Sequence, residues 1–305
     1  MLDKIYLEIT NVCNLSCSFC HKTKREKRLM TAKEFDILTD KLRGKIRFLY
    51  FHLMGEPTLH PLLPEFIRSA REKGFLPMLT TNGSLLGEKG ELLLQSLPYK
   101  ISISLHAPEA NPTFASDSYL DDCILFAKRA AEKGCIVALR LWNLGSDADN
   151  SDILSKLHEE FPGEWKSIRG GVSEKLGEKL FLEWGERFEW PDDEPNEVFK
   201  GSSGGGVKNC DKKPLKAFSC ESKEEPEVFC YALRTHAGVL VDGSVVPCCL
   251  DADGVLTLGN LFESELDDIL ASPRAKAIFD GFSQRRAAEK FCQSCGFVKK
   301  FSIKS

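Results

Sequence analysis

Short apolar runs alternate with amphipathic segments along the first half of the chain. Five runs have the length of a strand and are rich in β-branched or aromatic residues, at positions 4–10, 46–52, 75–81, 100–106 and 135–141. Segments with apolar residues at helical spacing lie at positions 31–42, 61–73, 88–97, 120–133 and 151–161. The first opens with Thr31 and carries Glu34 three residues later, the spacing of a capping box. The repeated strand-then-helix order predicts a parallel sheet curled into a partial barrel, whose active site follows the carboxyl ends of the strands.

The second half of the chain departs from this order. Residues 179–184 predict a sixth strand, and residues 191–227, rich in proline, glycine, lysine and glutamate, predict a long surface connection. From Cys230 onward we expect a hairpin around Asp242 and Gly243, a helix over 265–279 and a cysteine-bearing tail. The predicted fold is α/β: a partial (β/α)6 TIM-like barrel over residues 1–190, a connecting segment over 191–228, and a small β-hairpin/α domain over 229–305.

Composition and charge narrow the class of protein. Hydrophobic residues make up 42% of the 305 residues and charged residues 28%, which is normal for a globular chain. The sequence has no run of eighteen apolar residues and no signal-peptide pattern, so we expect a cytoplasmic protein that neither spans a membrane nor is secreted. Since 41 basic residues face 45 acidic ones, we expect no general nucleic-acid binding. Twelve cysteines in a reducing compartment indicate metal ligands rather than disulfides.

Three cysteines lie on the loop after the first predicted strand. Cys13, Cys17 and Cys20 have the spacing C-x3-C-x2-C. Three thiolates on one loop can hold three corners of a cubane iron–sulfur cluster and leave the fourth iron without a protein ligand. A zinc ion that takes a fourth ligand, such as the adjacent His21, is the alternative. The position at the end of the first strand favours the reactive cluster.

With Phe19 before its last cysteine, this loop resembles the C-x3-C-x-aromatic-C signature of the radical SAM superfamily. Residues 54–57 resemble the family's G-G-E-P motif with Met54 in place of the first glycine, residues 80–83 resemble its T-N-G motif, and residues 102–106 resemble its fourth-strand segment. The resemblance implies a 4Fe–4S cluster that binds S-adenosylmethionine (SAM). The cofactor-binding residues that it implies are Phe19, Gly55, Glu56, Pro57, Thr81, Asn82, Ser102 and Ser104.

Arg140, on the fifth predicted strand, is a further candidate for cofactor binding. Its guanidinium can bind the SAM carboxylate through charge-assisted hydrogen bonds, or form a salt bridge at the barrel rim. In the family, SAM chelates the free iron, and one electron yields a 5′-deoxyadenosyl radical that abstracts a hydrogen atom. The resemblance thus implies a cofactor that performs the difficult step and a protein that binds, orients and excludes solvent.

A second set of cysteines occupies the carboxyl-terminal unit. Cys230, Cys248, Cys292 and Cys295 are spaced C-x17-C-x43-C-x2-C, and the segment resembles the Twitch domain, the shortened form of the SPASM extension. The resemblance implies an auxiliary 4Fe–4S cluster held by these four residues. A zinc site built from the same thiolates is the alternative.

The remaining cysteines and one acid complete the candidates. Cys249 could replace its neighbour as a ligand, donate a hydrogen atom to the substrate, or be a buried core residue. Asp251 matches the region where sulfatase-maturing relatives carry an acid that takes a proton from the substrate, although a solvated hairpin aspartate is the alternative. We assign Cys123 and Cys135 to packing and leave Cys210 and Cys220, in the polar connection, without a role.

The basic run 21–28 is either solvated surface or a landing site for an acidic flavodoxin or ferredoxin that supplies the electron. As a whole, the sequence predicts a radical SAM oxidoreductase or maturase that acts on a small molecule or a peptide. The alternatives are an iron–sulfur electron-transfer or binding protein without turnover, and a radical SAM enzyme of cofactor biosynthesis.

Overall fold

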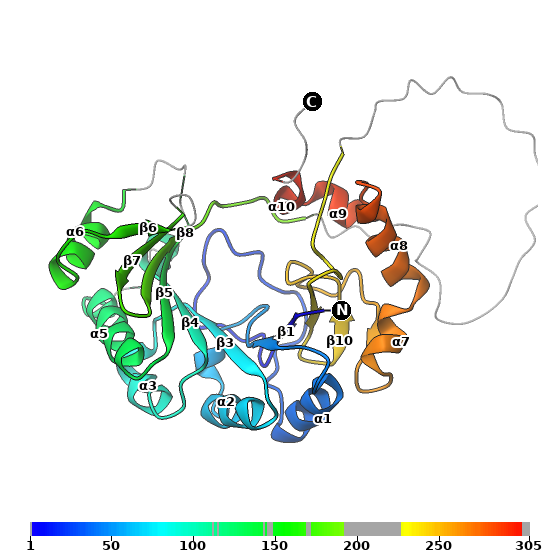
Figure 1. The fold of residues 1–305 in the computed structure, drawn as a ribbon, viewed down its shortest axis with the longest axis horizontal. Helices are drawn as coiled ribbons and strands as arrows, with labels where there is room; N and C mark the ends of the chain where they lie inside the picture. The colour runs from blue at the N-terminus through cyan, green and yellow to red at the C-terminus, as the bar shows by residue number, and fades with distance from the viewer. Residues whose placement is uncertain are drawn as a thin grey trace, which may run out of the picture.

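Six parallel strands form the centre of the computed structural model, which describes residues 2–111, 113–114, 116–142, 144, 149–168, 172–191 and 227–300. In pairing order they are β1 (Lys4–Leu7), β2 (Phe48–Tyr50), β3 (Leu76–Thr81), β4 (Lys100–Ser104), β5 (Ile136–Leu141) and β8 (Leu180–Trp184). The helices along the outer face are α1 (Ala32–Leu42), α2 (Leu63–Glu72), α3 (Leu86–Leu93), α5 (Tyr119–Glu132) and α6 (Ser151–Glu160) (Figure 1). The predicted partial (β/α)6 barrel is confirmed.

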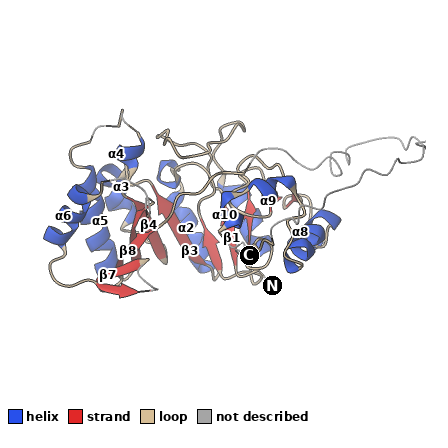
Figure 2. Ribbon diagram, turned by 90° about the horizontal axis from the view of Figure 1, so that it is seen from above, coloured by secondary structure: helices blue, strands red, loops and turns tan. Residues whose placement is uncertain are grey.

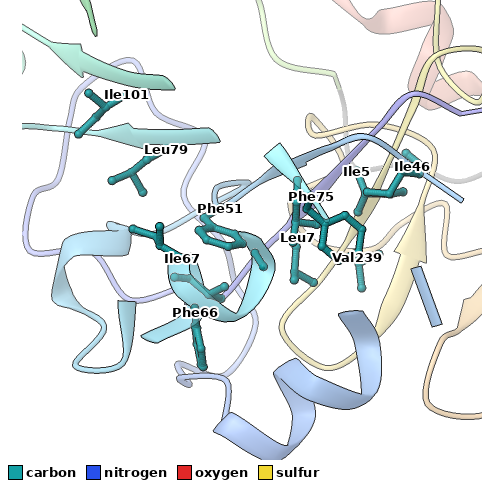
Figure 3. Packing of buried hydrophobic residues seen from close by; sticks show 14 of the residues in the cluster. Ile5, Leu7, Ile46, Phe51, Phe66, Ile67, Phe75, Leu79, Ile101 and Val239 are labelled. Atoms are coloured by element: carbon teal, nitrogen blue, oxygen red, sulfur yellow. The ribbon is translucent and has the colours of Figure 1, made fainter. Parts of the chain in front are cut away.

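Local sequence signals account for the helix boundaries and for the core. The Thr31 hydroxyl accepts a hydrogen bond from the Glu34 amide while the Glu34 carboxylate accepts one from the Thr31 amide, so the capping box is formed. Alternation along each strand divides the side chains between two faces. On β1, Ile5 and Leu7 are fully buried in the layer of packed residues shown in Figure 3, whereas Lys4 and Tyr6 face the barrel lumen.

Several short elements were not predicted. β6 (Lys166–Ile168) and β7 (Ser173–Gly177) add an antiparallel edge beyond β8. A 3-10 helix, η1 (Pro57–Leu59), follows β2, and a one-turn helix, α4 (Ala107–Ala110), follows β4. Both short helices lie at the carboxyl ends of strands, where they shape the loops of the candidate site.

The carboxyl-terminal unit continues the barrel sheet. β9 (His236–Val239) and β10 (Ser244–Val246) form the predicted hairpin, with Gly243 at a φ of +84° in its turn, and β11 (Gly259–Asn260) pairs with β10. β9 also pairs in parallel with β1, which gives the order β11-β10-β9-β1-β2-β3-β4-β5-β8-β7-β6. The boundary predicted at residue 229 thus separates two segments of one sheet.

The single helix predicted over 265–279 is wrong. Two helices, α7 (Leu266–Leu270) and α8 (Pro273–Ser283), replace it, because Pro273 cannot continue a helix and Ser272 caps the second one. α9 (Lys290–Ser294) and α10 (Gly296–Lys299) carry the tail, and Figures 1 and 2 place α8 at the opposite end of the sheet from α6. Cys210 and Cys220 lie outside the described residues. Within the described ranges, no helix is long and apolar enough to cross a membrane.

Candidate functional site

The loop between β1 and α1 presents Cys13, Cys17 and Cys20 next to the carboxyl ends of the strands. The Cys20 amide donates to the Cys17 carbonyl at 3.1 Å, which folds the end of the loop into a turn. Asn111, directly after α4, holds the loop from the other side, since its Oδ1 accepts from the Ser16 amide at 2.8 Å and its Nδ2 donates to Cys17 Sγ at 3.2 Å. Sequence reasoning missed Asn111, whose only signal is that it closely follows the fourth strand.

The three sulfurs form a donor set suited to a cluster. Cys13 is exposed and Cys17 and Cys20 are half-buried. Burial, followed by smaller effects that include repulsion between the thiolates, raises the pKa of Cys13 and of Cys20, so a bound metal group is what would stabilise the thiolates. Three thiolates on one loop are a ligand set for three corners of a cubane cluster, with the fourth iron left open.

Gly55 packs closely against the backbone of Thr10 and Val12, just before the first cysteine. Its φ is +78°, and a Cβ at this position would lie 2.4 Å from the Thr10 carbonyl oxygen and 2.9 Å from that of Val12. The Glu56 amide donates to the same Val12 carbonyl at 2.8 Å. The glycine is therefore required for close approach of two backbones.

The Glu56 side chain joins the ends of β2 and β3. Its Oε1 accepts from the Thr58 amide and hydroxyl and from the Thr81 hydroxyl at 2.7 Å, and its Oε2 accepts from the Asn82 amide at 2.7 Å. Glu56 and Thr81 are buried, as is Pro57 in η1. The Glu56 and Thr81 side chains thus bond to each other, whereas Asn82 Nδ2 donates to Asn14 Oδ1 in the cysteine loop at 3.1 Å, and contacts of these residues with a cofactor stay a prediction.

The remaining predicted cofactor contacts face the barrel lumen. Ser104 and Arg140 are paired in register on β4 and β5, and both line a cavity of about 520 Å³. Ser102 lines an adjoining cavity of about 200 Å³. Arg140 lies 3.7 Å from the Glu183 carboxylate and stacks over Trp142 at 4.3 Å, so it forms the expected rim salt bridge and still borders the larger cavity.

The second cysteine set lines the same large cavity. Cys230 precedes β9, Cys248 follows β10, Cys292 lies on α9 and Cys295 lies between α9 and α10. The pKa of each thiol is raised, chiefly by burial, and for three of them repulsion from another cysteine of the set adds to the effect. Four converging thiolates are a complete ligand set for a cubane cluster.

Phe19, from the first cysteine loop, also lines this cavity. The Phe19 ring packs against His106 with 4.9 Å between ring centroids, and its carbonyl accepts a hydrogen bond from Trp190 Nε1 at 2.9 Å. The Arg187 guanidinium lies 5.1 Å from the centre of the Phe19 ring. One cavity is thus lined both by Phe19 of the first cysteine loop and by the second cysteine set.

Cys249 and Asp251 differ in their access to this cavity. Cys249 is half-buried and lines it, and burial raises the pKa of its thiol to about 11. Asp251 is fully buried, and its two oxygens accept from the Val255 and Leu256 amides, both at 2.8 Å. The Asp251 carboxylate thus folds its own loop and does not line the cavity, and its role in taking a proton from the substrate stays a prediction.

The interpretation of the basic run as solvated surface holds for Lys22, Lys24 and Lys27, which are exposed, but not for Arg25. Arg25 donates to both oxygens of the fully buried Glu8 at 2.7 and 2.8 Å, and its Nε donates to the Ala252 carbonyl at 2.8 Å. The Asp253 carboxylate accepts from the Thr23 hydroxyl at 2.5 Å. The run ties the cysteine loop to the carboxyl-terminal unit.

Comparison with protein-family models assigns the two halves of this site. The radical SAM superfamily model matches residues 7–139, and the SPASM iron–sulfur cluster-binding domain model matches residues 230–296. Residues 7–139 thus match a radical SAM domain and residues 230–296 a SPASM domain. The first match implies a 4Fe–4S cluster and SAM, and the second implies further iron–sulfur binding.

Curated relatives align with only part of this chain. The tungsten-containing aldehyde ferredoxin oxidoreductase cofactor-modifying protein of Pyrococcus furiosus is 30% identical over 114 residues, 36% of this chain and 31% of that protein. The probable GTP 3',8-cyclase of Metallosphaera sedula is 35% identical over 120 residues, 35% of each chain. The alignment thus spans about a third of each relative.

Solved structures match over nearly the whole chain. BtrN in an open conformation has a TM-score of 0.53 at 16% identity, covering 99% of this chain and 96% of that one. SuiB of Streptococcus suis bound to its precursor peptide SuiA has a TM-score of 0.58 at 17% identity, covering 98% and 70%. At these identities the comparison shows a shared fold.

Proposed function

We propose that this protein cleaves SAM reductively and removes a hydrogen atom from a substrate held between its two cysteine sets, with oxidation or maturation of the substrate as the outcome. The observation that carries the proposal is the single cavity of about 520 Å³ lined by Phe19 of the first loop and by Cys230, Cys248, Cys292 and Cys295. When bound, the first cluster and SAM supply a 5′-deoxyadenosyl radical, and a cluster at the second set supplies an acceptor for a further electron.

The protein's own part is to bind, orient and shield. Ser104 and Arg140 face the cavity and can hold the ribose and carboxylate of SAM. Trp142, Phe188 and Trp190 line the cavity wall, and such aromatic surface excludes water from a reactive intermediate. The volume falls within the range of about 300–1,000 Å³ that is typical of small-ligand sites.

We further propose a flavodoxin or ferredoxin as the source of the reducing electron. Lys22 and Lys27 are exposed on the segment that follows Cys20. An acidic partner would be attracted to this edge of the loop, and the rate of electron delivery should then fall as ionic strength rises.

The test of SAM cleavage is anaerobic reconstitution with iron and sulfide, addition of dithionite and SAM, and chromatography for 5′-deoxyadenosine. We expect the nucleoside from the native chain and none from the triple variant with Cys13, Cys17 and Cys20 changed to Ala. The triple variant should keep iron at the second set. An intact native chain with full iron that forms no nucleoside would favour an electron-transfer or binding role instead.

The acceptor role of the second set is tested separately. With Cys292 and Cys295 changed to Ala, we expect iron to fall by about half while 5′-deoxyadenosine still forms, because the first cysteine loop is unchanged. The melting transition of the same preparation shows whether the variant is folded. A folded double variant that no longer cleaves SAM would contradict the acceptor role.

A further inference from the structure

The described side chains that line the large cavity include cations but no carboxylate. Among the described residues that line it, Lys4, Arg140 and Arg187 are cationic and none is Asp or Glu. Arg187 forms an ion pair with Glu109, and Arg140 lies 3.7 Å from Glu183, so each of these two has a counter-charge outside the cavity. Lys4 forms no ion pair with any residue in the described ranges.

Lys4 lies over an aromatic platform beside an unsatisfied imidazole. Its ammonium is 5.7 Å and 5.6 Å from the ring centres of Tyr6 and Tyr50. The His52 ring stands nearly edge-on to the same two rings, at 5.3 and 5.6 Å, and its Nδ1 is buried without a hydrogen-bond partner in the part of the chain that is described. A half-buried cation without a counter-ion and a buried polar atom without a partner both lose free energy that an anionic ligand would restore.

Lys4 is the first residue of β1, whereas the first cysteine loop follows the carboxyl end of the same strand. Burial, together with the charges of Arg187 and Arg140, lowers the pKa of His106 to about 4 at the Phe19 end. Burial and the charge of Lys4 lower the pKa of His236 to about 4 on the neighbouring strand β9. Lys4 and His236 thus lie on the side of the second cysteine set, whereas His52 also lines the adjoining cavity that Arg140 borders.

We propose that this side of the cavity binds an anionic group of the substrate, a carboxylate or a phosphate, with Lys4 as its main contact and His52 as a second hydrogen-bond partner. The inference rests on the proposed function, because SAM is assigned to the Phe19 end. The hydrogen to be abstracted would then lie between the anionic group and Phe19.

The experiment uses the anaerobically reconstituted chain saturated with SAM and measures binding by calorimetry. Two matched probe pairs are compared: glutarate with its neutral diamide, and glycerol 3-phosphate with glycerol. We expect at least one anion to bind while its neutral partner does not, and the preferred anion identifies the carboxylate or phosphate source. Lys4→Met should weaken that binding at least tenfold and Lys4→Arg should retain it. Lys128→Met is the control, since Lys128 is similarly half-buried but paired with Glu160 outside the cavity.

Three results would overturn the proposal: no binding of either anion, binding that SAM abolishes by competition, or binding unchanged in Lys4→Met. If Lys4→Met shifts the midpoint potential of the second cluster and leaves probe binding intact, Lys4 offsets the charge of the thiolates and the proposal fails. Formation of 5′-deoxyadenosine in the same preparation separates the two hypotheses. Its absence refutes the proposed function, whereas its presence without anion binding refutes the anion site alone.

Discussion

Replacing Arg25 with Met should destabilise the protein strongly through Glu8. Glu8 is fully buried, and its carboxylate accepts from Arg25 at 2.7 and 2.8 Å, from the Val241 amide at 3.0 Å and from the Met54 amide at 3.3 Å. Removing one partner of a buried ion pair costs about 3–5 kcal/mol, because the other charge is left uncompensated. For a chain of this length we expect the melting temperature to fall on the order of 5 to 15 °C.

The pH dependence of this loss has a defined sign. Burial raises the pKa of Glu8 above its usual value even though Arg25 opposes the shift. Without Arg25 the pKa rises further, so the variant takes up a proton in acid and its carboxylate loses the buried charge. The deficit in stability relative to the native chain should therefore be smaller near pH 5 and grow as the pH rises toward 8.

The assay is thermal melting of the anaerobically reconstituted protein with iron determined on the same sample. Arg28→Met is the matched control, because its ion pair with Glu34 is half-exposed and worth at most about 1 kcal/mol. The double variant Glu8→Gln with Arg25→Met should be more stable than Arg25→Met alone, since no charge is left buried. A loss below about 1 kcal/mol in Arg25→Met, or a double variant no more stable than the single one, would refute the reasoning.

Three further outcomes follow from the site. Gly55→Val should displace the cysteine loop, because the new side chain would collide with the Thr10 carbonyl, and so should lower the iron content at the first site. Gly44→Val is the control: Gly44 also has a positive φ but has open space around it, so this variant should lose stability only. Equal iron content in the two variants would contradict this reasoning. Asp251→Asn should lower the melting temperature while 5′-deoxyadenosine still forms, since one of the two amides that donate to the carboxylate loses its acceptor; an unchanged melting temperature would contradict the loop-folding role. Asn111→Ala should slow cluster assembly measured by visible absorption, since the loop loses two hydrogen bonds; an unchanged rate would show that the loop is held without them.

The sequence predicts the barrel well because its signals are local. The helix over α1 follows from the Thr31 cap and the spacing of its apolar residues, and the strands follow from runs bounded by turn residues. The pairing of β9 with β1 could not be predicted, because alternation shows which face of a strand is buried but not which strand lies beside it. The break before Pro273 was visible in the sequence and was overlooked.

In the candidate site too, the sequence predicts some features and not others. The cysteine spacing predicts the cluster ligands, since their chemistry is carried by residue type. The contacts of Glu56 and Asp251 could not be predicted, because a motif does not show whether both oxygens of a carboxylate are already occupied by the protein itself. Lys4 had no motif to mark it, and only the structure shows that it lines the cavity without an ion pair to any of the described residues.

The pairing of β1 with β9 also sets an order for biosynthesis. β1 lies between β2 and β9 in the sheet. Lys4 on β1 pairs with His236 on β9, although the two residues are more than 230 positions apart in the chain. At about 5–20 residues per second, a ribosome needs roughly ten to fifty seconds to make the missing partner after the first strand emerges. During that interval one edge of β1 stays open, and Arg25 has no Ala252 carbonyl to bind. Insertion of the first cluster into a fully supported loop is therefore a late event, which follows synthesis of the segment that carries the second set of cysteines.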